Sequence, residues 1–201
     1  MEKLIKTSGI LDKLFKVIRN IVIVVGIVCI PLLIISLTLP ESWYTNIADT
    51  ANTSIWLDSI ELQLNLSLPV SGTLKAAVSA ILTLAAVSCG IIAYGLQLLR
   101  NILAPIKNGD PFNNAVSHNL RKLGWLAVTG SVVYSVLSAI SLHFISSLYD
   151  MTSLFKEGSV NGIVVNYRYN IDFLIVAALL FLLSYVFRYG EELQRQSDET
   201  L

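Results

Sequence analysis

The sequence predicts a mainly α-helical membrane protein, a four-transmembrane-helix bundle with a small extracytoplasmic β-sheet formed by the 1–2 and 3–4 loops. Three observations predict this fold class. Of the 201 residues, 54% are hydrophobic and 14% are charged, whereas a soluble domain carries about 25% charged residues. Several apolar runs reach the roughly 20 residues that a bilayer span requires. Both loops expected outside contain segments in which apolar and polar residues alternate.

The N-terminal part of the chain is predicted to form a basic amphipathic segment, 1–19, and the first span, 20–39. Lysines lie on one side of the basic segment and leucine, isoleucine and phenylalanine on the other. That pattern suits a helix on an anionic membrane surface, although lysines that only set the topology produce the same pattern. No small-residue cleavage site follows the span, so we expect it to be retained. Pro31 removes a backbone donor and predicts a kink.

The two outer loops, 40–72 and 147–170, contain the predicted strands. Apolar and polar residues alternate in 60–68 and again in 163–170, and period two is typical of a strand with one buried face. Because a lone strand is not stable, these strands are expected to pair with each other. Both lead towards the membrane, so direct pairing would be parallel unless another strand, such as 54–57, lies between them.

The remaining spans are predicted at 73–99, 123–146 and 171–187, with a corner at 100–122 and a tail at 188–201. Lysine and arginine accumulate on the side that holds both termini, and such accumulation marks the cytoplasmic side. The basic residues on that side are Lys3, Lys6, Lys13, Lys16, Arg19, Arg100, Lys107, Arg121, Lys122, Arg188 and Arg195. We therefore expect a multi-pass protein of the inner or plasma membrane, with both termini in the cytoplasm.

The corner contains a run of residues that predicts a sharp turn between two helices. Gly109 can end the incoming helix in a left-handed conformation. Asp110 is expected to be the N-cap of the next helix, with Pro111 in its first turn. Phe112 then begins an apolar face, and Arg121 lies on the polar face of the same helix.

No pattern in the sequence is typical of catalysis, cofactor binding or metal binding. There is no phosphate loop, serine elbow, zinc motif or CxxC pair, and His118 and His143 each stand alone. Cys29 and Cys89 fall inside apolar runs, where packing explains them. No ionisable residue lies deep within a span, which disfavours a coupled transporter. Net charge is zero. We expect a non-enzymatic protein of the lipid bilayer, without a cofactor or direct nucleic-acid binding.

Two segments on the expected cytoplasmic side carry a family resemblance. The first is 108–112, followed by 119–124; the second is 187–194, followed by 197–201. This pair resembles the Domain of Unknown Function 2975 family, which comprises bacterial and archaeal four-span membrane proteins. Its members have a Gly-x-Pro-Phe loop and a Gly-x-x-Leu-Gln tail that ends in a short acidic and then apolar motif. The resemblance covers essentially the whole chain, although the usual final Asp-Leu-Thr is loosened here to Asp-Glu-Thr-Leu.

The resemblance implies no established activity, but it does imply a partner. Family members are often encoded beside small helix-turn-helix regulators, which implies a membrane component that binds or controls a small cytoplasmic DNA-binding regulator. The residues that would bind this partner are Gly109, Asp110, Pro111, Phe112, Arg121, Glu191, Glu192 and Leu193. In such a signalling protein the outer sheet would sense the envelope or a small ligand. The intramolecular alternative is that Phe112 packs on Leu193 and the tail caps the inner face of the bundle.

Two other classes of function also fit the sequence. A small transporter, or an export or immunity component, could pass a peptide or a lipophilic compound through a bundle without buried charge. A structural subunit of a larger membrane complex would have the same hydropathy. A homo-oligomer is compatible with the sequence, but nothing in it indicates one.

Overall fold

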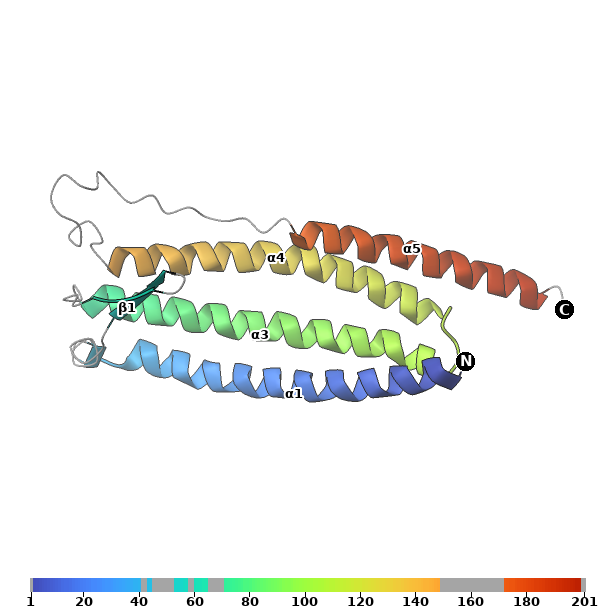
Figure 1. Cartoon of the computed structure of the whole chain (residues 1–201), viewed down its shortest axis with the longest axis horizontal. Coiled ribbons are helices and arrows are strands. Elements are labelled where there is room, and N and C mark those ends of the chain that lie inside the picture. The colour runs from blue at the N-terminus through green and yellow to red at the C-terminus, as the bar shows by residue number, and fades with distance from the viewer. Residues whose placement is uncertain are drawn as a thin grey trace. The chain divides into compact units, whose positions relative to one another are not determined.

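The computed structural model describes residues 2–40, 43–44, 53–57, 60–64, 71–148 and 172–199. Its long helices are α1 (Glu2–Thr38), α3 (Ser71–Lys107), α4 (Asn114–Leu148) and α5 (Asp172–Glu199), as labelled in Figure 1. Two short strands, β1 (Thr53–Leu57) and β2 (Ile60–Leu64), lie between α1 and α3 in the sequence. The helix α1 passes through Pro31 without a break, so the basic segment and the first span belong to one helix.

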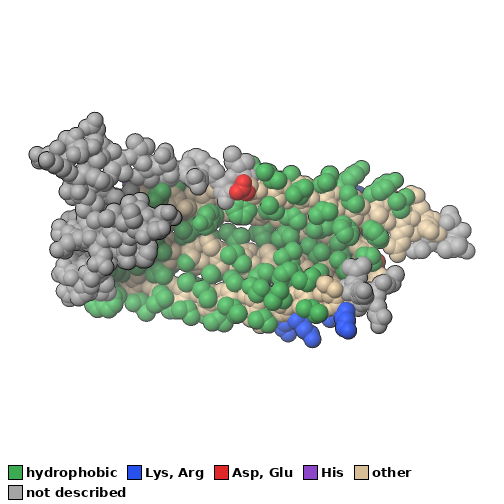
Figure 2. Space-filling view, in the orientation of Figure 1, with side chains coloured by type: hydrophobic (Ala, Val, Ile, Leu, Met, Phe, Trp, Pro, Cys, Tyr) green, Lys and Arg blue, Asp and Glu red, His purple; other side chains and the backbone are tan. Residues whose placement is uncertain are grey.

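Four helical segments of the described chain are long and apolar enough to cross a membrane. They are Lys6–Thr38, Leu74–Lys107, Asn114–Ile145 and Asp172–Ser197. The shortest has 26 residues, which at 1.5 Å per residue extend about 39 Å, more than the roughly 30 Å of a hydrocarbon core. Large apolar side chains are exposed along all four helices, and Figure 2 shows them covering much of the visible surface. These features indicate a multi-pass membrane protein built mainly from α-helices.

The predicted extracytoplasmic sheet between the two loops is wrong. Strand β2 pairs with β1, from the same loop, as an antiparallel hairpin in which Leu57 lies opposite Ile60. No other strand occurs in the part of the chain that the structure describes. The expected partner, 163–170, and the end of the first predicted strand, 65–68, lie outside the described residues. Closing a short loop costs less conformational entropy than closing a long one, which favours the local pairing.

The described residues divide into two compact units. The first contains α1 up to Val28, α3 from Ala86, α4 up to Ser135, and all of α5. The second contains the remaining parts of α1, α3 and α4 together with β1 and β2.

In the second unit, two side chains donate hydrogen bonds to backbone carbonyls at the end of α1 and just after it. The buried Tyr44 donates its hydroxyl proton to the carbonyl oxygen of Ser36, at 2.6 Å. Lys75 Nζ donates to the carbonyl oxygen of Leu39, at 3.1 Å. These bonds satisfy backbone carbonyls that a helix C-terminus leaves without an intrahelical partner.

The first unit has a small core where α3, α4 and α5 meet. Val116 is completely buried, and Ile102 and Leu120 are buried against it. Ile106, Leu123, Leu180 and Phe187 pack around these three residues. Val116 and Leu120 belong to the apolar face predicted for the helix after the corner, and both pack inward, whereas Phe112 of the same face is 41% exposed. The core supports the corner between α3 and α4.

Candidate functional site

The corner begins where α3 ends at Lys107. Gly109 has a φ of +85°, so the predicted left-handed cap is confirmed. Its N–H donates to the carbonyl oxygen of Ile106 at 3.2 Å, and the N–H of Asp110 donates to that of Pro105 at 3.1 Å. This pair of bonds is a Schellman motif, which satisfies the last carbonyls of a helix and reverses the chain.

The N-cap of α4 is Asn113, and the prediction that Asp110 is the cap was wrong. Asn113 Oδ1 accepts the backbone N–H of Ala115 at 2.9 Å, and its carbonyl accepts that of Val116 at 2.8 Å. Asp110 acts one step earlier, because its Oδ2 accepts Asn113 Nδ2 at 2.7 Å. Pro111 therefore lies in the turn before α4 and not in its first helical turn. The Asp110 carboxylate therefore orients the side chain of the N-cap residue Asn113.

Phe112 leaves this turn and packs on α5. Its ring centroid lies 5.9 Å from that of Phe187, with 41° between the ring planes. The ring also covers Gly190, where an added Cβ would lie 2.5 Å from Phe112 Cδ1. Only a residue without a side chain fits under the ring in this position. The Gly-x-Pro-Phe loop and the glycine of the tail motif therefore meet in one contact, although 78 positions separate Phe112 from Gly190.

The contact between α4 and α5 continues along both helices. The buried Ser184 donates its hydroxyl proton to the carbonyl oxygen of Ser117 at 2.8 Å. Further along, Phe181 covers Gly124, where an added Cβ would lie 2.8 Å from the ring. Trp125 packs edge-on against Phe181, with ring centroids 5.6 Å apart. Glycine and serine let helices approach closely, as is typical of helix pairs in membranes.

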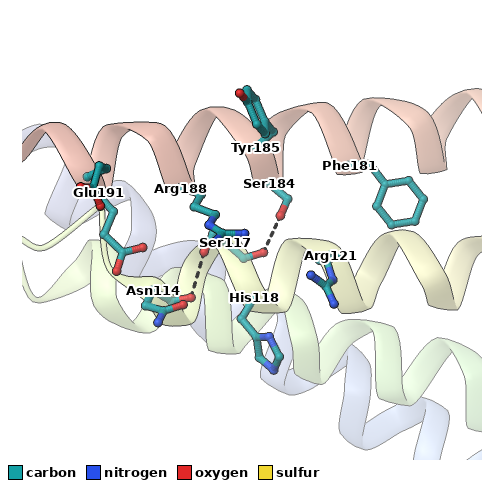
Figure 3. Close-up of a pocket in the computed structure, with 10 residues that line it drawn as sticks. Asn114, Ser117, His118, Arg121, Phe181, Ser184, Tyr185, Arg188 and Glu191 are labelled. Carbon is teal, nitrogen blue, oxygen red and sulfur yellow. Dashed lines mark hydrogen bonds between the residues drawn. The ribbon is translucent and has the colours of Figure 1, made fainter.

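A cleft of about 480 Å³ opens beside this contact (Figure 3). Residues of both α4 and α5 line it. They are Asn114, Ser117, His118, Arg121, Phe181, Ser184, Tyr185, Arg188, Glu191 and Glu192. The cleft therefore combines cationic, anionic, hydroxyl and aromatic side chains in one place.

The last turns of α5 carry charged and apolar side chains that are mostly exposed. Glu192 accepts a hydrogen bond from Arg195 at 2.9 Å, and Arg195 also lies 3.8 Å from Glu199. Tyr189 and Leu193 are 61% and 49% exposed.

The eight residues predicted to bind a partner fall into two groups in the structure. Gly109, Asp110 and Pro111 build the turn that presents Phe112. Arg121, Glu191 and Glu192 line the cleft, whereas Leu193 is not part of its lining and lies three residues after Gly190 on α5. Phe112 lies over Phe187 and Gly190.

Four contributing residues were not among the predicted ones: Asn113, Phe187, Arg188 and Gly190. Phe187, Arg188 and Gly190 belong to the tail motif that carries the family resemblance. Their membership of this motif could have identified them as contributing residues. Asn113 is one of two adjacent asparagines, and either is a good N-cap.

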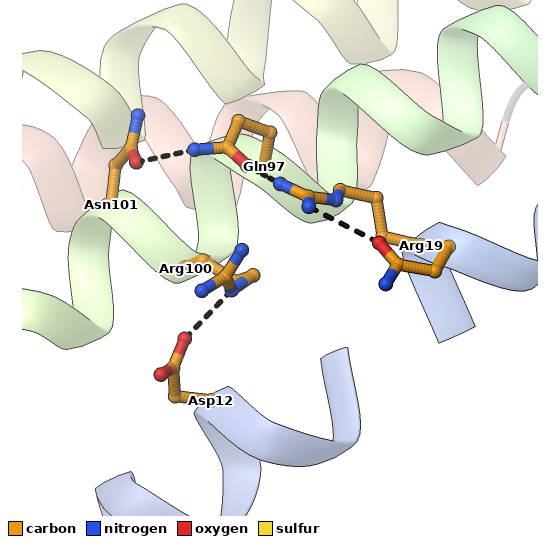
Figure 4. Close-up of polar contacts among 6 residues, drawn as sticks. Asp12, Arg19, Gln97, Arg100 and Asn101 are labelled. Carbon is orange, nitrogen blue, oxygen red and sulfur yellow. Dashed lines mark hydrogen bonds and ion pairs between the residues drawn. The ribbon is translucent and has the colours of Figure 1, made fainter. Parts of the chain in front are cut away.

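A second polar cluster joins α1 to α3 in the same unit (Figure 4). Arg100 Nε donates to Asp12 Oδ1 at 2.7 Å, and both side chains are largely buried. Arg19 donates to Gln97 Oε1, and Gln97 Nε2 donates to Asn101 Oδ1 at 2.9 Å. The cluster holds α1 beside α3 through charge-assisted hydrogen bonds.

The sequence matches the family described as "Protein of unknown function (DUF2975)" over residues 65–201. This chain belongs to the DUF2975 family. The matched region includes α3, α4 and α5, and hence the corner, the Phe112–Gly190 contact and the whole cleft. The helix α1 and the hairpin precede it. No curated protein and no solved structure matches the chain.

Proposed function

We propose that this DUF2975 protein is a non-enzymatic signalling component with both termini in the cytoplasm. It binds a small cytoplasmic regulator, such as a helix-turn-helix protein, through the corner and the last turns of α5. The observation that carries this proposal is the packing of Phe112 on Phe187 and Gly190. It joins the two motifs of the family into one surface.

The orientation rests on the distribution of basic residues. Lys107 ends α3, Arg121 and Lys122 lie near the start of α4, and Arg188 follows the apolar part of α5. Short loops rich in lysine and arginine stay on the cytoplasmic side during insertion. The corner and the last turns of α5 would then face cytoplasmic proteins.

The exposed side chains at the end of α5 suit a basic protein partner. Tyr189 and Leu193 offer apolar area, and the segment 188–201 carries four carboxylates against two arginines. DNA-binding proteins carry clustered positive charge, and complementary charge steers association and selects partners. A few side chains supply most of the binding energy in protein interfaces, and tyrosine is over-represented among them.

Through the Phe112 contact, binding of a partner to α5 could change the conformation of the corner. The ring is 41% exposed, so a partner on α5 could contact it directly. A partner that displaced the ring from Gly190 would alter the turn between α3 and α4. Membrane helices and a bound regulator would thereby influence each other, and such a coupling is reciprocal.

The test is affinity capture of the tagged full-length protein from its native membrane in mild detergent, with identification of bound proteins by mass spectrometry. The expected result is capture of a small DNA-binding protein. Deletion of residues 188–201 should abolish its capture, and Leu193→Ala should lower its affinity at least about tenfold. Gln196→Ala is the matched control, because Gln196 is exposed on the same helix but lies outside the Gly-x-x-Leu-Gln motif.

Membrane insertion of each variant must be compared in parallel, because a variant that fails to insert would lose the partner trivially. Capture of the same DNA-binding protein by the deletion variant would remove α5 from the interface. Capture of membrane proteins alone would overturn the regulatory proposal.

A further inference from the structure

The cleft between α4 and α5 contains charged groups that form no hydrogen bond or ion pair with the described residues. Arg121, Arg188 and Glu191 line it, and none of the three has a hydrogen bond or ion pair with any residue that the structure describes. Glu192 differs, because Arg195 already binds it. A volume of about 480 Å³ lies within the roughly 300–1,000 Å³ of small-molecule sites.

These charges follow a fixed order along α5. Phe181 and Tyr185 come first, Arg188 follows one turn later, and Glu191 is three residues further on, which is about 4.5 Å along the helix axis. Figure 3 shows Arg188 directed towards Ser117 on α4, Arg121 projecting from α4 near Phe181, and Glu191 lying nearer Asn114. From the apolar end outwards, the lining is therefore aromatic, then cationic, then anionic.

The cleft also lies where a span leaves the hydrocarbon layer. Arg188 is the first charged residue of α5 after Asp172, about 24 Å away along the axis, which places it near one edge of a roughly 30 Å core. Tyr185 lines the cleft and is 72% exposed, and Trp125, which packs on the lining residue Phe181, is 58% exposed. Tryptophan and tyrosine gather at the level of lipid headgroups.

We propose that this cleft binds the headgroup of a phospholipid that carries a primary amine, of the phosphoethanolamine type. The phosphate lies between Arg121 and Arg188, and the ammonium group lies against Glu191. A phospholipid places its phosphate next to the glycerol and its amine further out, which is the order of the charges along α5. Arginine binds phosphate oxygens in a bidentate manner, and the carboxylate accepts the ammonium protons.

The same arrangement discriminates between headgroups. A phosphoglycerol headgroup offers no cation and leaves Glu191 unpaired beside added negative charge. A phosphocholine headgroup has no N–H to donate to the carboxylate. Unpaired charged groups in a partly desolvated site reduce affinity. The site therefore selects the amine as well as the phosphate, which goes beyond the proposed binding of a cytoplasmic regulator.

The test is native mass spectrometry of the purified full-length protein titrated with phosphatidylethanolamine, phosphatidylglycerol or phosphatidylcholine of identical acyl chains. We expect phosphatidylethanolamine to bind at least about tenfold more tightly than the other two. Arg121→Gln combined with Arg188→Gln should weaken its binding at least about tenfold. Glu191→Gln should abolish the preference over phosphatidylglycerol without weakening phosphatidylglycerol itself.

Arg195→Gln is the matched control, because Arg195 lies on the same helix but pairs with Glu192 and Glu199 and is not in the cleft lining. It should leave lipid binding unchanged. Equal binding of the three lipids, or binding unaffected by the arginine substitutions, would overturn the proposal. Full competition by inorganic phosphate alone would assign the cleft to free phosphate and overturn it as well. No cytoplasmic partner is present, so a negative result leaves the proposed regulator binding untouched.

Discussion

Two junctions in the first unit hold their helices together in opposite ways. Where α1 meets α3, charged and amide side chains bond across the interface, led by Arg100 and Asp12 at 2.7 Å. Where α4 meets α5, glycines receive aromatic rings, with Phe181 over Gly124 and Phe112 over Gly190. At the first junction the main contacts are hydrogen bonds between oppositely charged and amide side chains. At the second, the main contacts are aromatic rings packed closely on glycines.

The difference matters because the two kinds of contact fail differently. A hydrogen-bonded charge pair tolerates small shifts in helix position, but loss of one member leaves the other without a partner in a poorly hydrated place. Where a ring packs on a glycine, removing the ring should destabilise the helix contact less than adding a side chain at the glycine. Close-packed helices have no spare volume for the added atoms. Substitutions that add volume should therefore damage α4–α5 most, and substitutions that remove charge should damage α1–α3 most.

The largest effect is expected for Gly124→Val. Its added carbons would overlap Phe181, whose ring packs on Gly124 and against Trp125, both of α4. The expected loss of stability is about 3 kcal/mol, at the upper end for overpacking, measured by thermal unfolding in detergent micelles with tryptophan fluorescence. Gly90→Val is the matched control, since nothing lies within 4 Å of an added Cβ at Gly90. An equal loss from both substitutions would show that β-branching, and not the α4–α5 contact, is responsible.

A somewhat smaller effect is expected for Arg100→Ala. It leaves Asp12 unpaired with 26% of its side chain exposed, and the expected cost is about 2 kcal/mol. Asp12→Ala combined with Arg100→Ala should cost less than the sum of the single substitutions, because the first change already breaks the pair. Chemical unfolding of the four proteins gives this coupling energy. Additive losses would mean that the pair contributes nothing to the α1–α3 junction.

Gly190→Ala should have an effect whose sign depends on Phe112. Alanine favours a helix over glycine by about 1 kcal/mol, but in the native protein its Cβ must displace the Phe112 ring. The substitution should stabilise a Phe112→Ala protein by about 1 kcal/mol and should fail to stabilise the native one. Thermal unfolding of both pairs measures the difference. The same shift in both backgrounds would contradict the packing of Phe112 on Gly190.

The smallest effect is expected for Arg195→Ala. Its pairs with Glu192 and Glu199 lie on one exposed helix face, and 65% of the Arg195 side chain is exposed. Exposed pairs at this spacing contribute less than about 0.5 kcal/mol and are screened by salt. The unfolding temperatures of the Arg195→Ala variant and the native protein should therefore agree within error, at low and at high salt. A large loss would mean that α5 beyond Arg188 is more rigidly held than its contacts suggest.

The four apolar helices could be predicted from the sequence alone, because hydropathy over roughly 20 residues is a local property. The left-handed cap at Gly109 could be predicted for the same reason, since only nearby atoms define that turn. The family was also recognisable from the corner and tail motifs. The N-cap of α4 was harder to predict, because Asp110, Asn113 and Asn114 are all good capping residues within five positions. Which of them caps the helix depends on the geometry of the Schellman turn.

The contacts between residues far apart in the sequence could not be predicted and are known only from the folded structure. Alternating patterns at 60–68 and 163–170 were compatible with a sheet between two loops, yet β2 pairs with its neighbour β1. Nothing in a local pattern indicates that Phe112 covers Gly190, or that Arg121 and Arg188 share a cleft. Such contacts depend on the rotation and register of α4 against α5, which many residues determine together through close packing.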